Sequence, residues 1–218
     1  ASSGHDIVVL DNLSRGHRDL VRWGPLIEGD LRDTTLLREA LRWYRPDAVI
    51  HFAAFAYVGE SVTDPLKYYE NNLGKTIQLL QAMRDARVNK FVFSSTCASY
   101  GIPTAMPMTE DMPQVPINPY GQTKLMGETI LRDLGAADAA WQTACLRYFN
   151  PVGAHESGRI GEDPRDIPNN LMPYIAQVAV GRREQLFVYG DDYPKDLLSL
   201  IDSENLEVKY GGTLPNKT

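Results

Sequence analysis

Short apolar runs alternate with amphipathic stretches along most of this chain. The runs at residues 6–11, 26–29, 48–54, 90–95 and 143–149 are typical of strands buried in a parallel sheet. Between them, apolar residues recur at helical spacing, as at Leu36, Leu37 and Leu41. The spacing predicts helices at 34–44, 65–87 and 120–134, with a polar, proline-rich loop at 96–118 before the last of them.

The alternation of strand and helix predicts an α/β fold, with a doubly wound, Rossmann-like parallel sheet that helices cover on both faces. Sheets of this kind bind ligands outside the carboxyl ends of their strands. After Asn150 the composition changes to Gly, Pro, Asp and Asn, and a helix at 169–180 and a strand at 185–189 follow. We therefore expect a first domain at 1–150 and a separate region after it.

Composition and charge narrow the classes of function. Hydrophobic residues make up 43% of the 218 residues, which is enough for a packed core. The net charge of −6 is spread without long runs of one sign, so we expect no nucleic-acid partner and no anionic membrane surface. The two cysteines, Cys97 and Cys145, make neither a disulfide framework nor a metal site. We expect a reducing, cytoplasmic location and no metal.

The Gly-rich turn that opens a dinucleotide fold has no match here, so the fold is expected to lack its first β–α unit. Asp11 ends the first predicted strand, where an acid that binds the adenosine ribose belongs, and Asp30 follows the next strand. Each has a plainer interpretation: Asp11 opens a turn, and Asp30 caps a helix. Arg15 leaves NADP open beside NAD.

Tyr120 and Lys124 lie four residues apart, which places a phenol and an ammonium on one face of a helix. A nearby lysine cation, together with the positive nicotinamide ring of a bound cofactor, favours the phenolate, so we expect the pair to lower the pKa of the tyrosine and make it a base. The alternative is an ordinary amphipathic helix, with the tyrosine packed and the lysine solvated. Thr96 ends a strand some two dozen residues earlier, and taken alone it is a residue that merely ends that strand.

Several longer motifs, in the same order and spacing, resemble one family. They lie at residues 51–54, 58–62, 68–72, 94–96, 120–124, 146–154 and 167–174. Together they are similar to the UDP-glucose (UDP-galactose) 4-epimerases of the extended short-chain dehydrogenase superfamily, over about residues 5 to 194. The resemblance implies that 1–150 is a partial NAD-binding domain, that 151–194 begins an incomplete UDP-sugar-binding domain, and that the tail at 195–218 departs from the pattern.

The resemblance also implies a role for each candidate residue. Thr96, Tyr120 and Lys124 would do the chemistry. The cofactor NAD would be held by Asp11, Asn12, Asp30, Leu31, Phe52, Ala53, Ala54, Asn71 and Tyr148. The UDP-sugar would be bound by Asn150, Asn170, Leu171 and Tyr189. One departure is Ala56, which replaces a lysine that contacts the cofactor phosphate in some members.

The implied reaction is NAD-dependent 4-epimerisation of a UDP-hexose through a transient 4-keto sugar. Three alternatives were weighed. A 4-epimerase for UDP-arabinose and UDP-xylose shares these motifs. A dehydratase needs an acid pair after the threonine, whereas Cys97 and Ala98 follow Thr96, so we do not expect one. A non-catalytic chain that binds nucleotide weakly or not at all fits the absent Gly-rich turn. The resemblance further implies a homodimer paired through helices 65–87 and 120–134.

Overall fold

The structure is a computed structural model that describes residues 3–103, 107–163, 165, 168, 170–189 and 208–211, the last four and residues 188–189 by their backbone alone. It separates two compact units, 1–151 and 152–218, which are described one at a time. The assignment of the second unit to substrate binding and of 195–218 to a divergent tail stays a prediction. Of that tail, only 208–211 falls among the described residues.

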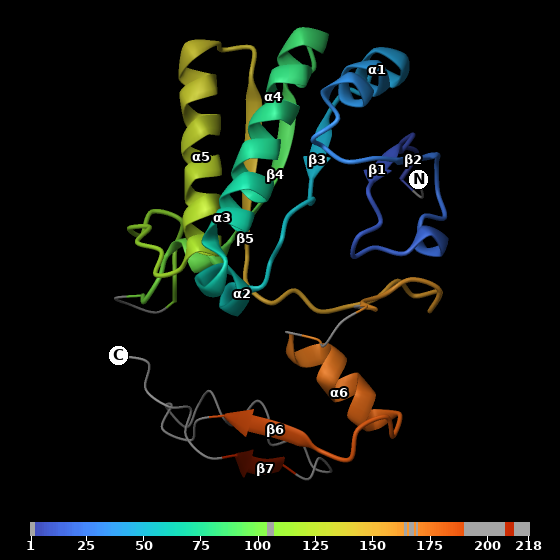
Figure 1. Ribbon diagram of the computed structural model, residues 1–218, viewed down its shortest axis with the longest axis vertical. Helices are drawn as coiled ribbons and strands as arrows, with labels where there is room; N and C mark the ends of the chain where they lie inside the picture. Colours follow the sequence, from blue (N-terminus) through green and yellow to red (C-terminus); the bar gives the residue numbers. More distant parts are fainter. Residues whose placement is uncertain are drawn as a thin grey trace. The chain divides into compact units, whose positions relative to one another are not determined.

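Strands and helices alternate through the first unit as the sequence predicts (Figure 1). Its strands are β1 (Val9–Asp11), β2 (Leu26–Glu28), β3 (Val49–His51), β4 (Lys90–Thr96) and β5 (Gln142–Tyr148). Its α-helices are α1 (Thr34–Tyr44), α2 (Val58–Thr63), α3 (Pro65–Tyr68), α4 (Lys75–Ala86) and α5 (Pro119–Ala137). A π-helical segment, Tyr69–Gly74, joins α3 to α4, and 3₁₀ turns lie at Arg18–Leu20 and Cys97–Ser99. The second unit contains α6 (Leu171–Ala179), β6 (Leu186–Tyr189) and β7 (Val208–Gly211).

The strands are parallel, but they do not form one continuous sheet. In the first unit β3, β4 and β5 form a three-stranded sheet in that order, and β1 pairs with β2 in a separate sheet. The prediction of a Rossmann-like parallel α/β fold is confirmed. The expectation of a single sheet is wrong, because β1 and β3 share no backbone hydrogen bonds.

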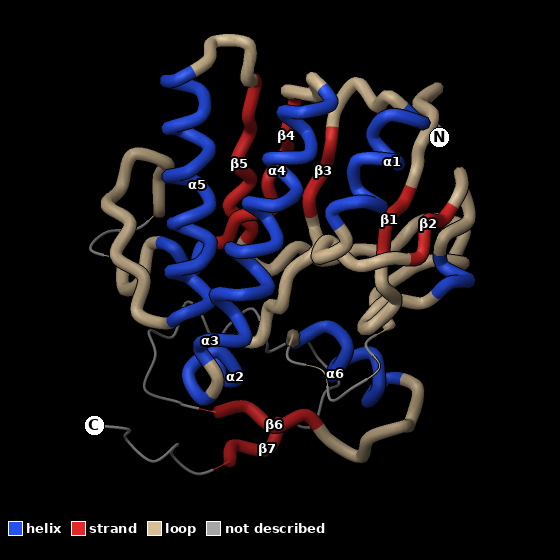
Figure 2. The backbone as a smooth tube through the Cα atoms, turned by 45° about the horizontal axis from the view of Figure 1, so that its top comes forward, coloured by secondary structure: helices blue, strands red, loops and turns tan. Residues whose placement is uncertain are grey.

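Helices α1, α4 and α5 lie on the same side of the strands (Figures 1 and 2). Residues that face them are buried, such as Phe91 and Phe93 at 1% exposure. On the other face, Ile50 and Leu146 are 60% and 41% exposed. In the described residues, therefore, helices cover one face and not both. Each right-handed crossover that steps the same way along a sheet places its helix on the same side, which accounts for this arrangement.

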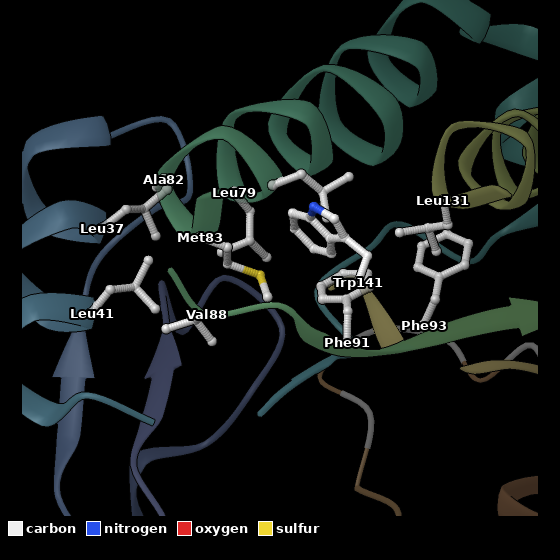
Figure 3. Packing of buried hydrophobic residues seen from close by; sticks show 11 residues of the cluster. Leu37, Leu41, Leu79, Ala82, Met83, Val88, Phe91, Phe93, Leu131 and Trp141 are labelled. Carbon is white, nitrogen blue, oxygen red and sulfur yellow. The ribbon is translucent and has the colours of Figure 1, made fainter. Parts of the chain in front are cut away.

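A single hydrophobic core lies between these helices and the strands (Figure 3). Aromatic rings of β4, Phe91 and Phe93, stack 6.2 Å apart beneath α4 and α5. Leu37 and Leu41 of α1 meet the apolar face of α4 in the same cluster, so α1 is fixed to the rest of the unit. Burial of each such side chain stabilises the fold by about 1.5–3 kcal/mol. This core holds β4 and α5, which carry the candidate catalytic residues.

The local sequence explains the ends of the helices near the candidate site. Asn118 caps α5 by accepting the backbone N–H of Gly121 at 2.8 Å, and Pro119 begins the helix, where its missing N–H costs nothing. The predicted continuous helix at 65–87 is instead divided into α3, the π-helical segment and α4. Helix α2 was not predicted, since six residues are too few to show a periodic pattern.

Candidate active site

Thr96, Tyr120 and Lys124 meet at the carboxyl end of β4. Thr96 is the last residue of the strand and is 6% exposed, while Tyr120 lies in the first turn of α5 and Lys124 lies one turn later. The Thr96 side chain lies close enough to the Tyr120 phenol to lower its pKa. The Lys124 Nζ atom lies 5.9 Å from the centre of the Tyr120 ring. The three residue types that the sequence singled out therefore form one cluster.

The phenol of Tyr120 is held in a mostly buried setting that raises its pKa. Burial is the main cause, and the Thr96 side chain acts in the opposite direction, while the neighbouring Cys97 raises the pKa further. The ring of Tyr68, which is fully buried, meets Tyr120 edge-on with centroids 6.5 Å apart. Burial of the phenol therefore favours its protonated form in this geometry.

Lys124 is itself buried, at 3% exposure, and burial lowers its pKa to about 8. Its Nζ atom donates a hydrogen bond of 2.7 Å to the carbonyl oxygen of Ser94 and lies 5.0 Å from the centre of the Phe93 ring. The expected lowering of the Tyr120 pKa by Lys124 is wrong for this geometry, because burial of the phenol dominates and the ammonium is directed at Ser94. The alternative of a solvated lysine on a surface helix is also wrong.

Ser61 is a site residue that the sequence did not single out. Its hydroxyl accepts the backbone N–H of Tyr120 at 3.2 Å and donates to the carbonyl oxygen of Val58 at 2.7 Å. It is fully buried and links α2 to the first turn of α5. A backbone N–H in the first turn of a helix has no partner inside the helix, so this contact fixes the position of Tyr120. A lone serine in a short polar stretch gives no signal of this role.

Asn72, within the π-helical segment, anchors the loop that follows β3. Its amide accepts from the Phe55 N–H and donates to the Phe55 carbonyl, both at 2.8 Å, and donates to the Thr123 hydroxyl at 3.4 Å. The predicted cofactor residue Asn71 donates to the Asn72 side-chain oxygen at 3.0 Å. Single π-helical turns are frequent at functional sites, because they redirect side chains that a regular helix would bury elsewhere.

Asp30 and Asn12 are brought together at the ends of β1 and β2. The Asp30 carboxylate accepts from Asn12 Nδ2 at 2.8 Å and from Arg32 N at 2.8 Å, and it pairs with the buried Lys75 ammonium at 2.8 Å. The pKa of Asp30 is lowered to about 2: burial opposes the change, and the hydrogen bond from Lys75 leads the groups that produce it. Asp30 does not cap α1, which Asp33 caps instead. Lys75 was not predicted from the sequence.

Asp11 forms the turn that its plainer interpretation describes. Its Oδ1 atom accepts the backbone N–H of Leu13 at 2.6 Å. A side chain added at Gly16 would lie 3.3 Å from the other carboxylate oxygen, so the backbone passes close to it. Leu31, half-buried, packs against the core beside Asp30.

The remaining candidates of the first unit lie beyond the ends of β3 and β5. Phe52 is 63% exposed and its ring lies 6.4 Å from that of the half-buried Tyr148, at an interplanar angle of 30°. Ala53 and Asn150 are exposed and Ala54 is half-buried. Two aromatic rings and small side chains therefore lie at these strand ends.

The second unit carries Asn170, Leu171 and Tyr189. Asn170 lies at the N-terminus of α6, donates to the Glu162 carboxylate at 3.2 Å and makes no side-chain cap, while Leu171 begins the helix and is 52% exposed. Tyr189 ends β6, and its side chain falls outside the described residues. In the described part of the chain, no cluster of His, Cys, Asp and Glu is able to hold a metal, and no helix has the length and hydropathy to cross a membrane.

Several known proteins are similar to this chain in both sequence and fold. A UDP-glucose 4-epimerase of Bacillus subtilis (strain 168) is 51% identical over all of this chain and 68% of its own length. The crystal structure of UDP-glucose 4-epimerase from Brucella ovis in complex with NAD is 50% identical, with a TM-score of 0.84 over 88% of this chain and 58% of that one. A UDP-glucose 4-epimerase from Bifidobacterium longum in complex with NAD⁺ and UDP is 40% identical, with a TM-score of 0.84 over 95% of this chain and 70% of that one.

The chain spans 68%, 60% and 59% of the lengths of three similar curated UDP-glucose 4-epimerases. The profile of one family, described as the NAD dependent epimerase/dehydratase family, matches residues 1–198. That range includes the whole first unit and all the candidate residues. The chain therefore belongs to the NAD dependent epimerase/dehydratase family.

Proposed function

We propose that this protein catalyses the NAD-dependent 4-epimerisation of a UDP-hexose, interconverting UDP-glucose and UDP-galactose. The observation that carries the proposal is the contact between Thr96 and Tyr120 at the carboxyl end of β4, with the buried Lys124 ammonium beside them. Strand ends of this kind are where parallel α/β folds bind their ligands. Similarity to UDP-glucose 4-epimerases supports the choice of substrate.

The three residues divide the proton transfer between them. Tyr120 takes the proton of the sugar 4-hydroxyl as phenolate, and the Thr96 hydroxyl, which lies near the phenol, relays it. Lys124 keeps most of its charge at neutral pH with a pKa of about 8, and in the complex we expect the positive nicotinamide ring of bound NAD to act with this cation in favouring the phenolate. Bound NAD would supply the hydride chemistry, accepting the hydride from C4 and returning it to the other face of the sugar.

The residues present fit the two nucleoside ends of NAD. Asn12, which is exposed, and Asp30, which is half-buried, are hydrogen-bonded to each other and form a polar cluster suited to an adenosine. Asp11 lies in the adjoining turn. At the other end, Phe52 and Tyr148 present aromatic faces close to Thr96, with which Tyr148 is paired in register. Leu31, Ala53, Ala54 and Asn71 complete the proposed set. Together, these proposed contacts would hold the cofactor in the orientation it needs over the sugar.

The proposed substrate residues are Asn150, Asn170, Leu171 and Tyr189, which would bind the UDP moiety. Asn150 lies just beyond β5, and Asn170 and Leu171 adjoin at the start of α6. Support comes from the Bifidobacterium longum relative, whose structure contains NAD⁺ and UDP. A pentose substrate, UDP-arabinose or UDP-xylose, is the alternative, since the candidate residues are the same for both sugars.

We also propose a homodimer that acts in the cytoplasm. A groove of about 520 Å³ along α5 is lined by four apolar side chains, Leu73, Leu125, Met126 and Ile130, together with the polar or charged Gln114, Gln122, Thr129 and Arg132. Ile77 of α4 is also exposed. An exposed apolar surface on two helices is suited to pairing with a second copy. Free cysteines at positions 97 and 145 agree with a reducing compartment.

The proposed activity is tested by supplying the purified chain and NAD with UDP-galactose or UDP-xylose and following the products by chromatography. Conversion of UDP-galactose to UDP-glucose supports the proposal, and preferential conversion of UDP-xylose supports the pentose alternative. Binding of NAD is measured separately by equilibrium dialysis. A chain that binds NAD but converts neither sugar, or one that binds no NAD, would overturn the proposal in favour of a non-catalytic role.

A further inference from the structure

A buried carboxylate connects the three elements that carry the candidate catalytic residues. Glu128 lies on α5 one turn beyond Lys124 and is 5% exposed. Its carboxylate accepts hydrogen bonds from the Ser95 hydroxyl of β4, from Arg147 Nη2 of β5 at 2.8 Å and from Gln114 Nε2 at 3.1 Å. A second bond from Arg147 Nε, at 3.0 Å, makes the pair bidentate. Bidentate pairs of this kind hold both partners in one geometry.

The same arginine attaches the loop that follows Thr96. Arg147 Nη1 donates to the Tyr100 hydroxyl at 2.8 Å and to the Glu110 carbonyl oxygen at 2.9 Å, and the guanidinium lies 5.1 Å from the centre of the Tyr100 ring. Arg147 thus joins the end of β5 to two points of the loop. The mechanism proposed above uses neither Arg147 nor Glu128.

Both partners of the pair are held in their charged forms. Burial alone would raise the pKa of Glu128, but hydrogen bonds from Arg147, Ser95 and Gln114 outweigh it and lower the pKa. The pKa of Arg147 is raised, first by its hydrogen bond to Glu128. Removing one charge would leave the other buried and unpaired, so the two residues act as a unit.

The backbone of Thr96 is held on both sides by this network. Ser95, which precedes it, is bonded to Glu128. Ser99, which follows it, donates to the Thr96 carbonyl oxygen at 2.8 Å and accepts from Gln114 at 2.9 Å, and Gln114 is also bonded to Glu128. Any shift of the carboxylate is therefore transmitted to the residue whose side chain contacts the Tyr120 phenol.

We propose that Glu128 and Arg147 are positioning residues that hold the end of β4, and with it Thr96, in place beside the first turns of α5. The proposal rests on the proposed function for its kinetic consequence, but not for its geometry. Beyond Thr96, the titratable groups near the Tyr120 ring are Lys124 on α5, Cys97 after β4 and Tyr68 on α3. None of these is hydrogen-bonded to the Glu128 carboxylate, so its loss acts on Tyr120 through Thr96.

The test uses Glu128→Gln, which keeps the shape of the side chain and removes its charge, and Arg147→Lys, which keeps the charge but not the fork of donors. Arg38→Gln is the matched control, because its pair with Asp85 joins two helices at 3.3 Å and is exposed. We expect kcat for UDP-galactose to fall at least about tenfold in Glu128→Gln, with KM changed by less than about threefold, since misplaced reacting groups cost turnover more than binding. The kcat of Arg147→Lys should lie between that of Glu128→Gln and that of the wild type.

A readout independent of turnover is the ionisation of Tyr120, obtained as the difference in phenolate absorbance between each protein and the same protein carrying Tyr120→Phe. Weakening the Thr96 contact removes an interaction that lowers the pKa of Tyr120, so Glu128→Gln should raise that pKa and Arg38→Gln should not. If Glu128→Gln fails to fold, Tyr100→Phe and Gln114→Leu, which leave the ion pair intact and release the loop, should cause smaller changes of the same sign.

The outcomes separate this inference from the proposed function. An unchanged Tyr120 pKa and an unchanged kcat in all these variants would overturn the positioning role. A change in the Tyr120 pKa in a chain that converts no UDP-sugar would support the positioning role and contradict the proposed function. A loss of stability in Glu128→Gln, with kcat per folded molecule and the Tyr120 pKa as in wild type, would reduce the pair to a structural role and refute the inference.

Discussion

One methyl group added at Gly127 tests how tightly α5 is packed on β4. An alanine Cβ at this buried position would lie 2.6 Å from Cζ and 2.9 Å from Cε1 of the Phe93 ring. Phe93 is 1% exposed and stacked against Phe91, so the ring has no room to retreat. The strain must move α5 away from β4, and α5 carries Tyr120 and Lys124.

Two opposing effects set the magnitude. Replacing glycine by alanine inside a helix stabilises it by about 0.5–1 kcal/mol. Overpacking a rigid core costs about 1–3 kcal/mol. For Gly127→Ala we therefore expect a net loss of about 0–2.5 kcal/mol in the free energy of unfolding. Gly135 of the same helix has no atom within 4 Å of an added Cβ, so Gly135→Ala should gain up to about 1 kcal/mol.

The free energies of unfolding of the two variants are compared by urea unfolding at equal m-values. Both variants gain the same stabilisation from replacing glycine by alanine in a helix, so the difference between them measures the cost of overpacking against Phe93. The difference between them should be about 1–3 kcal/mol. Adding Phe93→Leu to Gly127→Ala should recover part of the loss, with a coupling of about 1 kcal/mol between the two sites. If Gly127→Ala proved as stable as Gly135→Ala, the close packing of α5 on β4 would be refuted.

Two further predictions concern buried titratable groups. The folded-state pKa of Lys124, about 8, lies below the usual 10.5, so the unfolded chain binds more protons between these values and the free energy of unfolding should rise with pH across that window. Lys124→Met should remove this rise in urea titrations, and an identical pH dependence in both proteins would contradict the burial of the ammonium. Burial, followed by the charge of Lys124, lowers the pKa of His51 to about 3, so stability should fall as the pH drops from 6.5 toward 3. His51→Phe should weaken that fall, and an equally steep loss in the variant would show that His51 is accessible to protons.

The neutral state of His51 also follows from its hydrogen bond. The Thr76 hydroxyl donates its only hydrogen to the Asn72 carbonyl at 2.7 Å, so it must accept from His51 Nε2, 2.8 Å away. This assigns the proton to Nε2. Through these two hydrogen bonds, His51 of β3 is linked by Thr76 to the π-helical segment that carries Asn71 and Asn72.

Local patterns predicted the elements that depend on local chemistry. Helix α1 begins and ends where its apolar spacing indicates, because Asp33 accepts from the N–H groups of Thr35 and Leu36 and Arg45 ends the helix in the left-handed region. Strands β4 and β5 were predicted within two residues at each end because their apolar runs are long. The π-helical segment was missed, because it depends on contacts of Asn72 with residues 17 and 51 positions away.

Part of the candidate site was predictable for the same reason. A spacing of four residues on a helix put Tyr120 and Lys124 on one face, but the direction of the Lys124 ammonium depends on Ser94, which no spacing rule reaches. Ser61 and Lys75 gave no local signal, since their partners come from other elements. Arg147 does carry a local signal, because a charged residue next to the apolar residues of a predicted buried strand implies a buried partner.

The central claim is that the Tyr120 phenol exchanges a proton with the 4-hydroxyl of a UDP-sugar. The most direct measurement is kcat for UDP-galactose in Tyr120→Phe, with Tyr44→Phe, on the exposed end of α1, as the control and NAD binding measured alongside. We predict a fall in kcat of about 10²–10⁴-fold with NAD affinity retained, because only proton transfer is removed. Turnover by Tyr120→Phe close to that of Tyr44→Phe would contradict the account.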